Sequence, residues 1–158
     1  MLNTFSRWFK IQTAEAHCDV PCGVYDPASA ALAAKTVAVL AKKITDLPLP
    51  GPSASPVEQK AFENTVTRMV QVKEEHAQLC KKELLILWTD YFKPQHLEMF
   101  PDLHPTFWNA AKLCSYNKQN VDVAKAEELQ KACAQVADMF AKAQAAAAKA
   151  PAPAMAKK

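Results

Sequence analysis

The chain has 158 residues, about the length of one domain, and half of them are apolar, which is enough for one hydrophobic core. Its 19 basic and 16 acidic residues are spread along the sequence and give a net charge of only +3, so we expect no nucleic-acid partner. No apolar run is long enough to cross a bilayer, so we expect no membrane span.

Residues 1–16 contain an amphipathic stretch with Phe5, Trp8 and Phe9 on one side. They lack the apolar core of a secretory signal, although they end in the small-residue pattern Ala-Glu-Ala. We therefore expect a leader peptide of another kind, removed by a maturation protease. Five cysteines at irregular spacing fit a reducing compartment better than a disulfide framework, so we expect a cytoplasmic protein.

The composition favours helices, because glycine occurs only twice while Ala, Leu, Lys, Glu and Gln are abundant. Asp26 and Pro27 predict the start of a first helix, with Asp26 as N-cap and Pro27 as the first helical residue. The apolar spacing predicts that its buried face consists of Leu32, Val39, Leu40, Ile44 and Leu47.

A proline-rich segment, residues 46–56, predicts a turn region, and Ser55-Pro56 repeats the pattern of a helix start. A long second helix follows and ends before Pro94. Its expected buried residues are Phe62, Val66, Met69, Val70, Cys80, Leu84, Leu87, Trp88 and Tyr91.

Two further helices are expected, a short one over 105–116 and a fourth from about residue 120 to 142. The apolar face of the fourth is Val123, Leu129, Cys133, Val136 and Phe140. The Ala-, Pro- and Lys-rich segment 143–158 is expected to be a disordered tail. These elements predict an all-α fold, a four-helix bundle over residues 27–142, in which Cys80, Cys114 and Cys133 are buried, inert thiols.

Metal-binding chemistry is concentrated in the stretch HCDVPC, residues 17–22. If the chain begins at His17, its α-amine, the Cys18 amide nitrogen and the Cys18 thiolate form two fused five-membered chelate rings. Cys22 can supply the fourth position of a planar N2S2 site, which suits Ni(II) or Cu(II) better than zinc. The His17 imidazole can reach the same metal as an axial ligand. The amine exists only after residues 1–16 are removed.

Taken alone, the cysteine pair is a weak signal, since two cysteines at this spacing are more often structural or accidental. A zinc site would need a second pair of ligands, and His76, Cys80 and His96 are too scattered in the sequence to provide one.

The stretch HCDVPCGVYDP, residues 17–27, closely resembles the amino-terminal nickel hook of nickel-containing superoxide dismutases, and LWTDYFKPQHLEMFPDLH, residues 87–104, resembles a second segment of that family. The resemblance implies disproportionation of superoxide to dioxygen and hydrogen peroxide, with nickel cycling between Ni(II) and Ni(III). It also implies a homohexamer of four-helix bundles and a domain at 17–142 with its hook at 17–25.

By position, the resemblance makes His17, Cys18 and Cys22 the nickel ligands and Asp19 a hook-shaping residue of the catalytic set. Tyr25 and Tyr91 match two tyrosines that line the approach to the metal, although Tyr91 could also simply pack in the core. The family's glutamate and arginine that hold the axial histidine are replaced here by Ala33 and His76. His76 could take over part of that role, or it could be an ordinary solvated histidine.

Two other functions remain possible from the sequence. One is a non-catalytic nickel- or copper-binding helical protein that uses the same hook. The other is a helical interaction module with incidental cysteines. The two tyrosines favour the enzyme, since a metal carrier has no need of phenols beside an open axial position.

Overall fold

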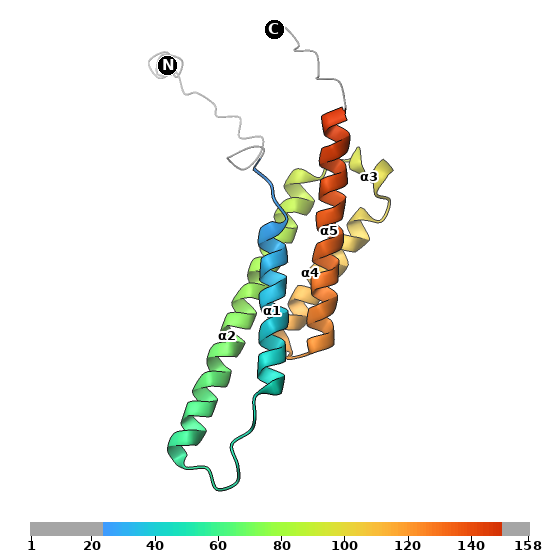
Figure 1. Ribbon diagram of the computed structural model, residues 1–158. Helices are drawn as coiled ribbons and strands as arrows, with labels where there is room; N and C mark the ends of the chain where they lie inside the picture. Colours follow the sequence, from blue (N-terminus) through green and yellow to red (C-terminus); the bar gives the residue numbers. More distant parts are fainter. Residues whose placement is uncertain (1–23, 150–158) are drawn as a thin grey trace, which may run out of the picture.

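The computed structural model describes residues 24–149, and these form a bundle of four long helices (Figure 1). The helices are α1 (Ala28–Asp46), α2 (Pro56–Ile86), α4 (Leu103–Gln119) and α5 (Val123–Lys149). A π-helical turn, η2 (Leu87–Tyr91), continues α2, and a single helical turn, α3 (His96–Met99), lies between η2 and α4. The all-α prediction is confirmed, and the described residues include no strand.

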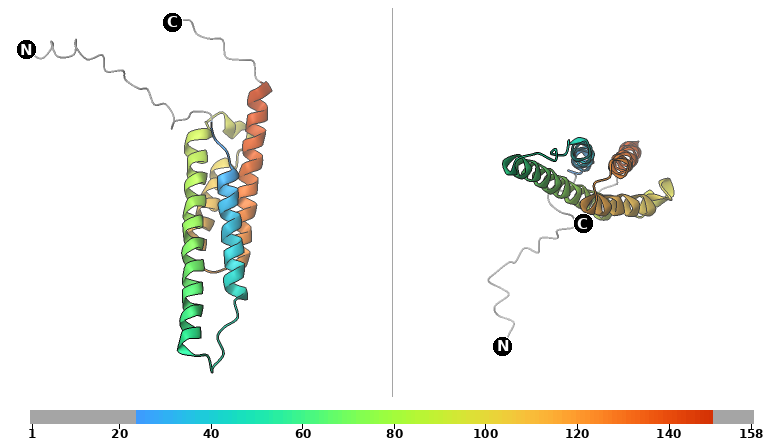
Figure 2. Two further views of the ribbon diagram at one scale, coloured as in Figure 1. Left: turned by 60° about the vertical axis from the view of Figure 1, so that its left-hand side comes forward. Right: turned by 90° about the horizontal axis from the view of Figure 1, so that it is seen from below.

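The four long helices run alternately up and down, and each packs against two neighbours (Figure 1). Helix α1 packs on α2 and α5, and α4 packs on the same two helices from the other side. Figure 2 shows that the first turns of α2 extend beyond the ends of α4 and α5. Because the helices alternate in direction, one end of the bundle holds the start of α1, the turn η2 and the end of α5 (Figure 1).

The helix starts follow the local sequence closely. Ser55 and Glu58 form a reciprocal capping box, in which the Ser55 hydroxyl accepts the Glu58 N–H and the Glu58 carboxylate accepts the Ser55 N–H at 2.7 Å. At α1 the prediction is off by one residue, because the helix begins at Ala28 rather than Pro27. The Asp26 carboxylate still accepts a helix-starting N–H, that of Ala28, at 2.7 Å.

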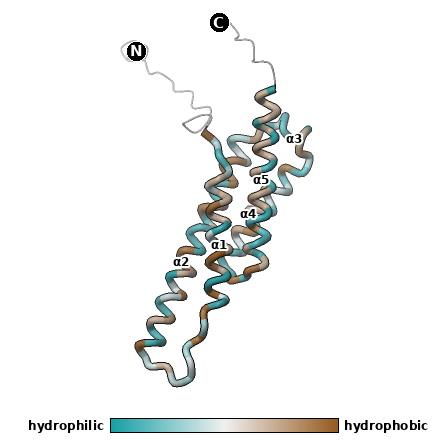
Figure 3. The backbone as a smooth tube through the Cα atoms, in the orientation of Figure 1, coloured by the Kyte–Doolittle hydropathy of each residue, from teal (hydrophilic) through white to brown (hydrophobic). Residues whose placement is uncertain are grey.

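The face that α1 buries differs from the predicted one. Leu32 and Val39 are 67% and 44% exposed, whereas the helix buries a face made mostly of alanine. That face consists of Ala30, Ala33, Ala34, Val37 and Ala41. Small side chains let two helix backbones approach closely, so the alanines pack against α2 and α5 while the leucine points outward. Figure 3 shows the resulting mixture of apolar and polar residues along α1.

The last two helices are longer than predicted. Helix α4 covers Leu103–Gln119 rather than 105–116, and α5 runs to Lys149 instead of ending near 142. Ala143 is only 2% exposed, so the segment just past the expected boundary still contributes to the core. The rest of the expected tail, residues 150–158, lies outside the described residues. The predicted apolar face of α5 is confirmed for Leu129, Cys133, Val136 and Phe140, all buried.

Candidate active site

Two tyrosines from distant parts of the chain meet at the end of the bundle where α1 begins. Tyr25 precedes α1, and Tyr91 is the last residue of η2. Their ring centroids are 5.6 Å apart, with the ring planes inclined by 58°. Both rings are half-buried and pack against the hydrophobic core. The structure thus brings Tyr25 and Tyr91 together, and their role beside a metal stays a prediction.

Aromatic side chains surround Tyr91 on three sides. The Phe140 ring of α5 lies 4.4 Å from it, and Phe92 meets it edge-on at 4.9 Å. The His96 ring stacks almost parallel to Tyr91, at 5.9 Å with an interplanar angle of 8°. Burial among these groups raises the pKa of the Tyr91 phenol above its ordinary value. At neutral pH the phenol therefore keeps its proton and can donate it.

His96 has a defined hydrogen-bonding role that was not expected from the sequence. Its Nδ1 accepts the backbone N–H of Lys93 at 2.9 Å, so the hydrogen of the neutral ring is on Nε2. Burial, and after it the charge of Lys93, lowers the pKa of His96. The ring is therefore neutral at pH 7. A signal for its role was present, because His96 lies within the matched segment 87–104.

Lys93 contributes a positive charge at the edge of this site. Its side chain is exposed, and its ammonium group donates to the backbone carbonyl of Asp90 at 2.7 Å. The ammonium group thus satisfies a carbonyl at the end of the π-helical turn. It also produces a local positive potential beside Tyr91, although the net charge of the chain is small.

The proposed nickel ligands cannot be placed by this geometry. His17, Cys18, Asp19 and Cys22 all lie outside the described residues. Within residues 24–149, no group of three or more His, Cys, Asp or Glu side chains is arranged to hold a metal ion. No helix in the same part of the chain is both long and apolar enough to cross a membrane.

The two positions where this chain departs from the family pattern have different surroundings. Ala33 is 1% exposed and belongs to the buried alanine face of α1. His76 is half-buried on α2, and its Nδ1–H donates to the Val72 carbonyl of the same helix at 2.8 Å. That bond leaves Nε2 of His76 as the ring's remaining acceptor.

Comparison with known proteins identifies close relatives. The model of the family described as nickel-containing superoxide dismutase matches residues 12–144. A Streptomyces coelicolor protein named superoxide dismutase (Ni) is 35% identical over 128 residues, which cover 81% of this chain and 88% of that protein. A Streptomyces seoulensis protein of the same name is 36% identical over 125 residues, covering 79% and 86%.

The described fold also matches solved structures. The native structure of a nickel superoxide dismutase superposes with a TM-score of 0.67 at 34% identity, covering 81% of this chain and 99% of that one. Two further structures, each with a TM-score of 0.67, describe the nickel ligation of such an enzyme in the oxidized state and after partial reduction.

Proposed function

The chain belongs to the nickel-containing superoxide dismutase family, and from that premise we propose that its nickel site is a hook formed by His17, Cys18 and Cys22. The enzyme disproportionates superoxide to dioxygen and hydrogen peroxide, and its cofactor is nickel. The alternative of a non-catalytic metal-binding protein is not favoured, because the curated relatives are named as dismutases.

The donor set of residues 17–22 fits nickel. A terminal amine, a deprotonated amide and two thiolates are strong anionic or neutral donors that favour a square-planar d8 ion. When bound, nickel supplies one-electron redox chemistry between Ni(II) and Ni(III). The thiolate and amide donors would stabilise the higher oxidation state, and the imidazole of His17 would serve as a further ligand.

The observation that carries the proposal is the meeting of Tyr25 and Tyr91, at 5.6 Å between ring centroids. Tyr25 follows Cys22 by three positions in the sequence. Because an extended chain spans at most about 3.6 Å per residue, the Cα atoms of Cys22 and Tyr25 can be at most roughly 11 Å apart. The two phenols are therefore available to the metal site that we propose.

The two phenols have a chemical role in this reaction. Conversion of two superoxide anions to dioxygen and peroxide consumes two protons. Tyr91 keeps its proton at neutral pH because burial raises its pKa, so its hydroxyl can orient an anion and donate a hydrogen bond to it. The aromatic groups around Tyr91 would allow only small molecules to reach the site. Lys93 provides a favourable local potential for an anionic substrate.

Several wider features of the protein belong to the same proposal. We propose that a protease removes residues 1–16, that Asp19 shapes the hook, and that His76 supports the His17 ring in place of the family's usual partners. The catalytic domain would begin at residue 17 and include the helices up to Lys149, where α5 ends. We further propose a homohexamer and a cytoplasmic location, the former because the family forms one and the latter because free cysteines suit a reducing compartment.

The amine-ligand hypothesis can be tested with two forms of the protein. One form begins at His17, released from a cleavable fusion, and the other retains residues 1–16. After incubation with nickel, metal content is measured by mass spectrometry and superoxide decay by stopped-flow absorbance. We expect nickel binding and dismutation only in the form that begins at His17. Equal nickel content and activity in the longer form would refute a ligand role for the His17 amine.

A further inference from the structure

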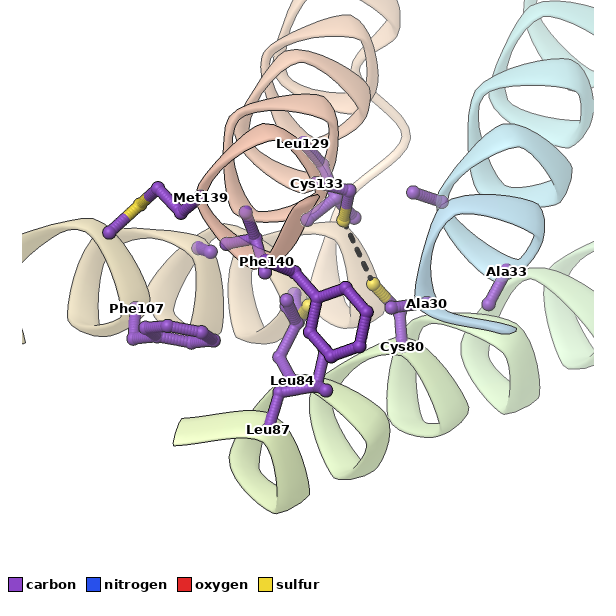
Figure 4. Close-up of a cluster of buried hydrophobic side chains, with 14 of the residues drawn as sticks. Ala30, Ala33, Cys80, Leu84, Leu87, Phe107, Leu129, Cys133, Met139 and Phe140 are labelled. Carbon is purple, nitrogen blue, oxygen red and sulfur yellow. Dashed lines mark hydrogen bonds between the residues drawn. The ribbon is translucent and has the colours of Figure 1, made fainter. Parts of the chain in front are cut away.

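Three cysteine side chains meet in the core of the bundle. Cys80, Cys114 and Cys133 come from α2, α4 and α5, and each is at most 1% exposed. The sulfur atoms of Cys80 and Cys133 are 3.5 Å apart, within range of a thiol hydrogen bond, and point toward each other (Figure 4). Cys80 also interacts with the Cys114 thiol. Packing alone requires only small apolar side chains here, not three thiols in contact.

The thiol pair lies close to the proposed active site. Figure 4 draws Cys80 and Cys133 in the same cluster of buried side chains as Phe140, Ala30 and Leu84. Phe140 in turn contacts the Tyr91 ring at 4.4 Å between centroids. Cys133 precedes Phe140 by seven residues on α5, so about two helical turns, roughly 10 Å, separate the pair from the aromatic group at the tyrosines.

We propose that Cys80 and Cys133 are a modification site, a thiol pair that hydrogen peroxide converts to a disulfide linking α2 to α5. The source of the oxidant depends on the proposed function, because peroxide is a product of superoxide disproportionation. The reactivity of the pair does not depend on it, so added peroxide can test the pair separately. Closing the sulfur–sulfur separation from 3.5 Å to a bond of about 2.05 Å requires a movement of roughly 1.5 Å.

The oxidation balances without any other reactant. One sulfur of the pair attacks one peroxide oxygen, the O–O bond breaks, and water leaves, so that this cysteine becomes a sulfenic acid. The other sulfur then attacks the sulfenic acid sulfur and displaces the hydroxyl as a second water. In total, two thiols lose two electrons and two protons, and one peroxide gains them to form two waters.

The surroundings of the two thiols change their pKa values in opposite directions. Hydrogen bonding from Cys80 lowers the pKa of Cys133 and so favours its thiolate, the form that attacks peroxide. Contacts with the Cys114 and Cys133 thiols, together with burial, raise the pKa of Cys80. Either sulfur can be the donor in the Cys80–Cys133 hydrogen bond, so either thiol can attack peroxide first, and both orders give the same disulfide. Because both are buried, peroxide reaches them through local opening, so the reaction is slow.

The disulfide would have a structural consequence. Cys80 and Cys133 are 53 positions apart in the sequence, so the bond closes a long loop and restricts the unfolded chain. By the chain-entropy relation the melting temperature would rise by roughly 15 °C. An enzyme that produces peroxide would thereby become more stable under the conditions in which it works.

The test uses full-length protein in which Cys18→Ser and Cys22→Ser remove the hook thiols, so dismutation plays no part. Reduced protein is treated with hydrogen peroxide, the remaining thiols are blocked, and peptides are mapped by mass spectrometry without reduction. We expect a peptide pair joined through Cys80 and Cys133, and a higher melting temperature that a reductant reverses. In the same background Cys133→Ala should abolish the link, while Cys114→Ala, the matched buried control, should retain it.

Three results would overturn the proposal. One is that all three thiols stay free after a peroxide treatment longer than the time for local opening. Hydrogen exchange of α2 and α5 measures that time. The second is a link that uses Cys114 instead of Cys133. The third is oxidation of isolated thiols to sulfinic acid with no link formed. Far-UV circular dichroism verifies that each variant is folded before it is treated.

Discussion

Replacing Phe140 by alanine should weaken the fold and alter the Tyr91 phenol together. Phe140 is 6% exposed and contacts Tyr91 at 4.4 Å, so its truncation leaves a cavity beside that ring. Buried Phe→Ala changes cost about 3–5 kcal/mol in the free energy of unfolding. With an unfolding entropy of about 2.1 cal/mol/K per residue over residues 24–149, a loss of about 4 kcal/mol lowers the melting temperature by roughly 15 °C.

The effect on the phenol follows from the same cavity. Burial is what raises the pKa of Tyr91, so water that enters beside the ring should lower that pKa toward the ordinary value of about 10. The measurement is a near-ultraviolet absorbance titration of tyrosine, with the Tyr91 signal isolated by subtracting the titration of a Tyr91→Phe variant. Thermal unfolding by circular dichroism gives the loss of stability.

A second core truncation on α5 separates the local effect from general destabilisation. Leu129 is fully buried on the same helix, and Leu129→Ala should cost about 2–5 kcal/mol while leaving the pKa of Tyr91 unchanged. If Phe140→Ala lowered stability as expected but left the Tyr91 pKa where it was, burial by Phe140 would not be the cause of the raised pKa. The role assigned to the aromatic surroundings would then be wrong.

Three further outcomes are expected. Cys18→Ser and Cys22→Ser should each abolish nickel binding and dismutation with unchanged helical circular dichroism; normal activity in either would refute that ligand assignment. Because the pKa of His96 is lower in the folded protein than in the unfolded chain, the free energy of unfolding should decrease as the pH falls below about 6.5. In His96→Asn the side-chain oxygen can still accept the Lys93 N–H, so urea unfolding at several pH values should show that this decrease is absent. Lys73 on α2 is 1% exposed, and its ammonium group donates to backbone carbonyls at the end of α4. Lys73→Met should therefore lower the free energy of unfolding in urea by about 2–4 kcal/mol. A decrease below about 1 kcal/mol would show that these hydrogen bonds do not stabilise the fold.

The parts of the fold that local sequence controls were predictable. The capping box at Ser55 and the apolar face of α5 follow from residues within one or two helical turns, and the structure has both. The end of α5 was missed because an alanine run has little hydrophobicity, although alanine has the highest helix propensity. The buried face of α1 was missed for a related reason, since hydropathy ranks Leu32 above the alanines that give the closest packing.

Local sequence patterns predict only part of the candidate site. Chelate geometry predicts His17, Cys18 and Cys22 as ligands from a few adjacent residues, because ligands that are close in sequence need no fold to bring them together, and this assignment stays a prediction. Tyr25 and Tyr91 are far apart in sequence, and only the resemblance to a family associated them. His96 and Phe140 contact Tyr91 through packing between separate elements, which periodicity alone cannot indicate.

The π-helical turn explains why Tyr91 lies at the edge of the core rather than in its interior. A regular α-helix would place Tyr91, four residues after Leu87, on the same buried face, as we predicted. In η2 the Phe92 N–H instead bonds to the Leu87 carbonyl five residues before it, at 3.1 Å. The wider turn brings Phe92 onto the buried face, where Leu87 and Phe92 are 2% and 6% exposed. Tyr91 is thereby left half-buried at the edge of the core, where its ring contacts Tyr25.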